Sequence, residues 1–146
     1  MIGTVFLTLE ETAVSKTSLN PETLFNSLQY GFSQIVVAQG HRTVYFSGQV
    51  AWDENQNIVG ENDLRAQVWQ SFRNVETAVS TAGATLSDIV ALHIYIVQSW
   101  MDQTAPVSEG LKEFFPENPP AATWIGVYGL ARPEFLIEIE GTAVTD

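Results

Sequence analysis

Residues 63–82, DLRAQVWQSFRNVETAVSTA, decide the fold of this chain of 146 residues. Their apolar side chains recur at spacings of three and four, which predicts a helix with one apolar stripe: Leu64, Val68, Phe72, Val75, Val79 and Ala82. Asn62 or Asp63 can cap the start of this helix, and Gly83 can end it in a left-handed conformation. Such a stripe requires a second layer to pack against.

The rest of the chain predicts that second layer. Residues 103–115 predict a shorter helix with Pro106 in its first turn, and the prolines that follow prevent its continuation. Residues 33–38 and 43–51 are expected to pair as a hairpin around QGHR, and three further segments predict strands: 91–97, 123–128 and 135–144. The order β-β-α-β-α-β-β predicts an α+β fold with two helices on one face of a single sheet.

The other face of this sheet is left without helices. The side chains expected there come from two strands: Tyr45, Ser47 and Gln49, or His93, Tyr95 and Val97. Their aromatic content predicts that the face is buried against further subunits. We expect one domain, 1–146, in which residues 1–20 form an N-terminal extension and TVFLTLEETAV, residues 4–14, supply an edge strand.

Composition argues against several functional classes. The chain carries 17 acidic and 6 basic residues, a net charge of −11, and no two basic residues are adjacent, which argues against a nucleic-acid partner. There is no cysteine, no long apolar run and no basic leader, so we expect a cytoplasmic protein without a membrane partner. His41 and His93 lie too far apart to be a local zinc pair, and neither a metal nor a cofactor is expected.

Several segments resemble the Rid family, also called the YjgF or endoribonuclease L-PSP family. They cover residues 34–144 in the family's order and include VYFSGQVAWD (44–53), AQVWQSFRNVETAVSTAGATLSDIV (66–90), ALHIYIV (91–97), PPAATWIGV (119–127) and LIEIEGTAV (136–144). The resemblance implies a ferredoxin-like or chorismate-mutase-like sheet, and a homotrimer in which the sheets form a central β-barrel. It also implies small-molecule clefts between the subunits.

Active members of this family hydrolyse enamines and imines such as 2-aminoacrylate, releasing ammonia and a 2-oxo acid. An arginine grips the substrate carboxylate, and a glutamate orients or deprotonates the attacking water. By resemblance the catalytic glutamate is Glu138, whereas the arginine position is occupied by Ala122. The other ligand-binding residues that we expect, partly by resemblance and partly because they neighbour Ala122 on its strand, are Tyr30 or Phe32, Ser108, Thr123 and Trp124.

The missing arginine leaves three functions open. The first is a hydrolase of changed substrate, which uses Glu138 and binds a neutral or aromatic ligand against Phe32 and Trp124. The second is a non-catalytic small-molecule-binding or regulatory protein. The third, an endoribonuclease or translation inhibitor, is disfavoured by the net charge. Little turnover of 2-aminoacrylate is expected, because the nearest cation in sequence, Arg132, lies in a turn far from Ala122.

Overall fold

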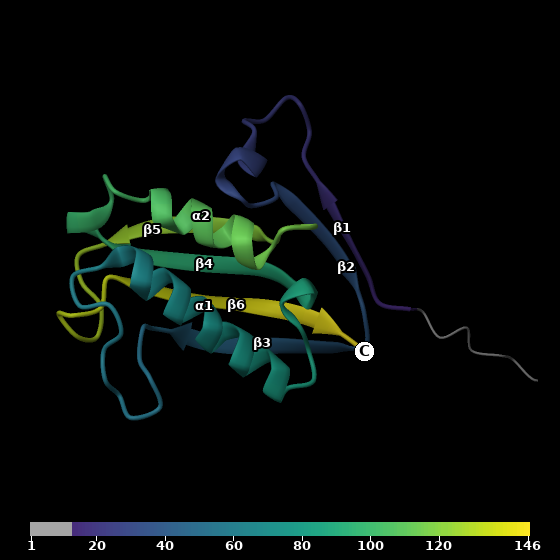
Figure 1. Cartoon of the computed structure of the whole chain (residues 1–146). Coiled ribbons are helices and arrows are strands. Elements are labelled where there is room, and N and C mark those ends of the chain that lie inside the picture. The colour runs from purple at the N-terminus through teal and green to yellow at the C-terminus, as the bar shows by residue number, and fades with distance from the viewer. Residues whose placement is uncertain (1–12) are drawn as a thin grey trace, which may run out of the picture.

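A computed structural model describes residues 13–146 of the chain (Figure 1). The main sheet has the strand order β3 (Arg42–Gln49), β6 (Ile137–Thr145), β4 (Ile89–Val97), β5 (Ala121–Val127). Strands β4 and β5 are parallel, and the other two pairs are antiparallel. Helices α1 (Leu64–Thr81) and α2 (Ala105–Phe114) lie on one face of this sheet. The predicted α+β class is therefore confirmed.

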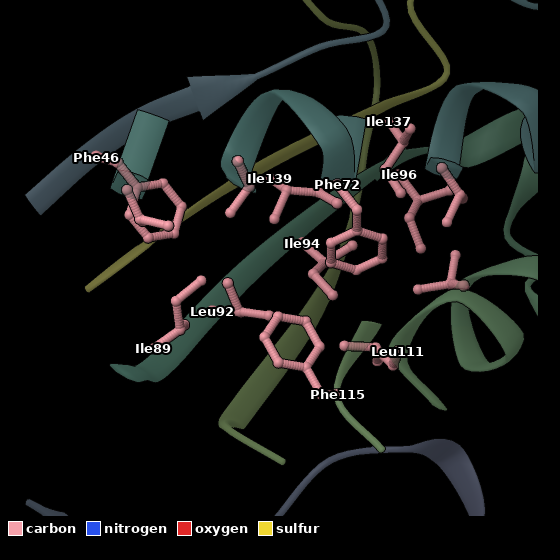
Figure 2. Close-up of a cluster of buried hydrophobic side chains, with 14 of the residues drawn as sticks. Phe46, Phe72, Ile89, Leu92, Ile94, Ile96, Leu111, Phe115, Ile137 and Ile139 are labelled. Atoms are coloured by element: carbon pink, nitrogen blue, oxygen red, sulfur yellow. The ribbon is translucent and has the colours of Figure 1, made fainter. Parts of the chain in front are cut away.

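The core lies between the sheet and the two helices. The apolar stripe of α1 is fully buried at Val68, Phe72, Val75 and Val79. Phe72 also contacts α2 and the residue after it, stacking on Phe114 at 5.1 Å and meeting Phe115 edge-on at 5.8 Å. From the sheet, the inward side chains of β4 and β6 complete the cluster in Figure 2, among them Leu92, Ile94, Ile96, Ile137 and Ile139.

The ends of α1 follow the local signals in the sequence. Asp63 Oδ1 accepts a hydrogen bond from the Ala66 amide at 3.0 Å, so Asp63 is the N-cap. Gly83 has φ +78° directly after the C-cap residue Ala82, as expected for a left-handed stop. The helix begins and ends one residue inside the predicted segment.

The predicted hairpin around QGHR is wrong. Strand β2 (Ile35–Gln39) pairs with β1 (Ser15–Leu19) in a separate two-stranded ribbon, and β3 pairs with β6. The chain bends at Gly40, where a Cβ would lie 2.8 Å from Val144 Cγ1, and the His41 amide donates to the Thr145 carbonyl at 3.0 Å. Strand β3 therefore pairs with the C-terminal strand β6 from its first residue, Arg42.

The N-terminal segment is described only in part. The edge strand expected over residues 4–14 lies almost wholly outside the described residues, and β1 begins just after it at Ser15. Lys16 on β1 donates to the Ser87 carbonyl at 3.1 Å, and burial lowers the pKa of its amino group to about 8. No helix within residues 13–146 is both long and apolar enough to cross a membrane.

Gln67 joins three segments in the interior. Its side chain is fully buried on α1, where Nε2 donates to the carbonyls of Gly60 at 3.0 Å and Glu134 at 2.8 Å. Its Oε1 accepts from the Leu136 amide at 2.9 Å. Because the Leu136 amide is committed to Gln67, β6 begins at Ile137, two residues later than the alternation of apolar residues predicted.

Replacing this amide should destabilise the fold. Gln67→Leu leaves the Leu136 amide and the Gly60 and Glu134 carbonyls without their partner, at about 1–3 kcal/mol for each group that stays dry. We expect the free energy of unfolding in urea to fall by about 3 kcal/mol. The exposed α1 residue Glu76 supplies the control, because Glu76→Leu should change stability by less than about 0.5 kcal/mol. Equal effects of the two substitutions would contradict this role for Gln67.

Candidate functional site

The face of the sheet opposite the helices carries polar side chains from three neighbouring strands. Tyr95 of β4 is paired with Glu138 on β6 and with Ile125 on β5, and two residues earlier His93 is paired with Glu140 and Thr123. Side chains paired in this way lie side by side on one face. We call this surface the open face.

Tyr95 and His93 both approach Glu140. Tyr95 Oη donates a hydrogen bond to Glu140 Oε1 at 2.6 Å, and His93 Nδ1 lies 3.8 Å from the same oxygen. The hydrogen bond to Glu140 raises the pKa of the Tyr95 hydroxyl above its ordinary value of 10.0, and burial and the charges of Glu140 and Glu138 act in the same direction. Glu140 is therefore held in place, whereas Glu138 keeps its oxygens free of such a partner.

Gly48 supports the carboxylate of Glu138. Between Phe46 and Gln49 the pairing of β3 with β6 contains one extra residue on β3, a β-bulge at Ser47 and Gly48. A Cβ at position 48 would overlap the Glu138 carboxylate and lie 2.8 Å from its Cγ. Glycine therefore lets the Glu138 side chain lie directly against the backbone of β3.

The open face is acidic. All six basic residues of the chain lie within residues 13–146, and none of them points from β3, β4, β5 or β6 onto this face. Arg65 and Arg73 are on α1, Lys112 is on α2, and Lys16 is on β1. Arg42 donates to the carbonyls of Asp146 and Ala82, and Arg132 lies over the ring of Trp52. Within residues 13–146, an anionic ligand would therefore find no lysine or arginine on this face, and the imidazole of His93 lies beside Glu140.

The aromatic residues predicted to bind ligand gather elsewhere. The Trp124 ring lies 6.4 Å from Tyr30 and 6.1 Å from Phe32, and Phe25 completes the cluster at 6.2 Å from Phe32. The loop that carries Phe32 is held against β5, because the Ser33 amide donates to the Pro120 carbonyl at 2.8 Å. We call Phe25, Tyr30, Phe32 and Trp124 the aromatic cluster.

The structure separates the predicted site residues into two groups. Ala122 and Trp124 are paired with the buried Leu92 and Ile94 of β4, so they share the helix-covered face and pack against the core. Ser108 is half-buried on α2, on that same side. Thr123, one residue after Ala122, is exposed beside His93 on the open face with Glu138.

Sequence reasoning identified part of the open face. Alternation grouped His93 with Tyr95 on it, and the structure confirms both positions, with half of the His93 side chain exposed. It did not identify Glu140 as the residue that both of them approach. Of the side chains expected on this face, Gln49 is turned by the bulge toward a groove beside Asn74 of α1, and Val97 is buried in the core cluster. The grouping of His93 and Tyr95 around Glu140 depends on the register of β4 against β6, which periodicity alone does not give.

Three comparisons with known proteins point to the same family. The family model described as Endoribonuclease L-PSP matches residues 26–145. The 3-aminoacrylate deaminase RutC of Acinetobacter baylyi is 36% identical over 100 residues, which are 68% of this chain and 77% of that protein. The Rid-family protein YyfB of Yersinia pestis is 40% identical with a TM-score of 0.84, and the match covers 88% of this chain and 98% of that one. The structure of Escherichia coli TdcF with bound serine is 28% identical with a TM-score of 0.64, covering 71% and 81% of the two chains.

The Tyr95–Glu140 hydrogen bond should make a pH-dependent contribution to stability. Because the pKa of Tyr95 is raised in the folded state, this contribution is complete below about pH 10 and is lost as the pH rises through the folded pKa. The stability difference between wild type and Tyr95→Phe should therefore shrink in urea unfolding above about pH 10. Tyr45→Phe, on the exposed part of β3, is the matched control. A wild-type advantage over Tyr95→Phe that stays constant into strong alkali would refute this assignment.

Proposed function

Because this chain belongs to the Rid family, described as endoribonuclease L-PSP, we propose that it is a deaminase-like hydrolase of small imines or enamines that lack a carboxylate. Glu138 is the catalytic residue in this proposal. The observation that carries it is the position of Glu138, half-buried against Gly48 on a face where residues 13–146 place no lysine or arginine.

The chemistry needs one base and one water molecule. Glu138 accepts a proton from the water as the water oxygen bonds to the carbon of the protonated imine, and a neutral carbinolamine forms. Glu138 then returns that proton to the nitrogen, the C–N bond breaks, and ammonia leaves. The carbinolamine hydroxyl becomes a carbonyl as its proton passes to Glu138 and from there to solvent. Water and the imine are consumed, and a carbonyl compound and ammonia are released, so no cofactor or metal is required.

Electrostatics favour a substrate without negative charge. A protonated imine is a cation, which Glu138 and Glu140 attract, whereas a substrate carboxylate would be repelled by both. In active relatives of this type an arginine would offset that repulsion. Here Ala122 stands at that position by resemblance, and the position beside it that faces Glu138's side of the sheet is Thr123. We therefore expect 2-aminoacrylate to be a poor substrate.

A complete cleft requires more than one subunit. Glu138 and the aromatic cluster lie on opposite faces of the same sheet, so a single chain does not bring them together. In a homotrimer, Glu138 of one subunit would meet the aromatic cluster of the next. The open face, with Tyr45 80% exposed on it, would then be buried in the assembly.

The second candidate function is small-molecule binding without catalysis. The indole Nε1 of Trp124 is buried without a hydrogen-bond partner among residues 13–146, which leaves a donor for an oxygen of a neutral ligand. This observation favours ligand binding at the aromatic cluster whether or not Glu138 is catalytic. An endoribonuclease role is disfavoured further by the acidic open face.

Substrate charge tests the proposal directly. Ammonia release should be faster from 2-aminoacrylamide, in which the carboxylate is replaced by a neutral amide, than from 2-aminoacrylate, when both are generated in the assay. Glu138→Gln should lower the rate on the amide by about 10²–10⁴-fold, and Glu134→Gln, on an exposed loop residue, should leave it unchanged. Saturable binding of the amide with no turnover would favour the second candidate. Faster turnover of 2-aminoacrylate would disprove the altered substrate preference.

A cation introduced on the open face should make the protein a better catalyst for the anionic substrate 2-aminoacrylate. Thr123→Arg places a guanidinium on the open face, whereas Ala122→Arg directs it toward the helices. We expect Thr123→Arg to raise the 2-aminoacrylate rate by about tenfold and Ala122→Arg to raise it less. The reverse order would show that position 122, not 123, faces the substrate in the assembled protein.

The assembly is tested by sedimentation equilibrium. We expect a particle of three times the 16.1 kDa chain mass at micromolar concentration. Tyr45→Glu, which adds charge to an acidic face, should shift the particle toward monomer. A wild-type chain that stays monomeric would contradict the proposal that the cleft is shared between subunits.

A further inference from the structure

A pocket of about 720 Å³ lies at the end of the sheet, where β4 and β5 finish and the loop before β6 turns back. Its wall combines apolar and aromatic side chains with a single charged one: Val97, Trp100, Tyr128, Leu130, Phe135 and Arg132. No acidic residue of the described chain lines it. A pocket that presents one cation and no carboxylate favours an anion over a cation.

Arg132 is held in position by aromatic contacts. Its guanidinium carbon lies 5.0 Å from the centre of the Trp52 ring, and Trp52 meets the buried Phe135 edge-on at 5.0 Å. Gln67 fixes the loop from both sides of Phe135, through the Glu134 carbonyl and the Leu136 amide. The exposed Arg132 guanidinium therefore lies against an aromatic ring, with no carboxylate of residues 13–146 bonded to it.

Within the described residues, no carboxylate accepts a hydrogen bond from the N–H groups of Arg132. Arg132 forms no ion pair with any acidic group of residues 13–146. Glu134 lines a smaller pocket on the other side of Arg132, beside Trp52, and is not paired with it. Arg65, by contrast, also lines a pocket but is paired with Glu109 and stacked on Trp69.

The rim of the pocket exposes a large aromatic side chain. Tyr128 is fully exposed, and Trp100, which also lines the pocket, is half-buried. Such side chains supply apolar surface that a bound ring can cover, while Arg132 pairs with a planar oxyanion.

We propose that this pocket binds a small aromatic carboxylate, with Arg132 gripping the carboxylate and Tyr128 and Trp100 contacting the ring. The site is separate from the open face, because Glu138, Glu140 and Gly48 do not line it. It stands independently of the proposed hydrolase function.

Calorimetry with phenylacetate tests the site. Phenylacetate should bind saturably, and phenylacetamide, its neutral counterpart, should bind about tenfold or more weakly. Arg132→Gln should weaken the binding of phenylacetate by a similar factor. Arg73 is an exposed residue of α1, and Arg73→Gln should leave this binding unchanged. Tyr128→Ala is a second variant that cannot disturb the core, because Tyr128 is fully exposed, and it should also weaken binding.

Amide NMR shifts locate the ligand. Shifts on adding phenylacetate should map to residues 97–100 and 128–136 and spare Gly48 and Glu138. Equal affinity of wild type and Arg132→Gln, shifts confined to the open face, or no saturable binding would each overturn the proposal. Binding of phenyl phosphate without binding of phenylacetate would overturn the assignment of a carboxylate ligand.

Discussion

The three hydrogen bonds of the Gln67 side chain set the geometry on which both candidate sites depend. A buried amide that satisfies two carbonyls and one amide of distant segments allows only one relative placement of those segments. It ends the loop before β6 at Leu136 and so determines which residue of β6 faces which layer. Because Gln67 holds the loop at Glu134 and Leu136, Glu138 lies on the open face and Arg132 lies beside Trp52.

The short segment from Arg132 to Glu138 separates two opposite electrostatic environments. Within residues 13–146, the face that carries the carboxylates of Glu138 and Glu140 has no lysine or arginine, and the guanidinium of Arg132 lies against an aromatic ring with no carboxylate paired to it. The net charge of −11 predicts neither environment, because salt screens the interaction between exposed charges beyond about 10 Å. Ligand preference follows from the local arrangement.

The sequence predicted the layers better than the pairing. The apolar stripe of α1, the Asp63 cap and the Gly83 stop are local, and each depends on neighbours within a turn or two. The partner of β3 depends on which distant strand competes best, and nothing near Gly40 encodes β6. Alternation correctly placed Ala122 and Trp124 on one face, but a period of two gives relative and not absolute orientation, so it did not reveal that this face is the covered one. For the same reason the grouping of His93 and Tyr95 around Glu140 required the register of β4 against β6.

The contact between Gly48 and Glu138 links two positions that are 90 residues apart in the chain. The overlap that a side chain at 48 would create involves the flexible end of Glu138, so the fold can tolerate it while the carboxylate cannot keep its place. Selection acting on the carboxylate would therefore act on the glycine as well. Among homologous chains, one that lacks the carboxylate at position 138 would no longer require glycine at position 48. The residues at the two positions should therefore vary together.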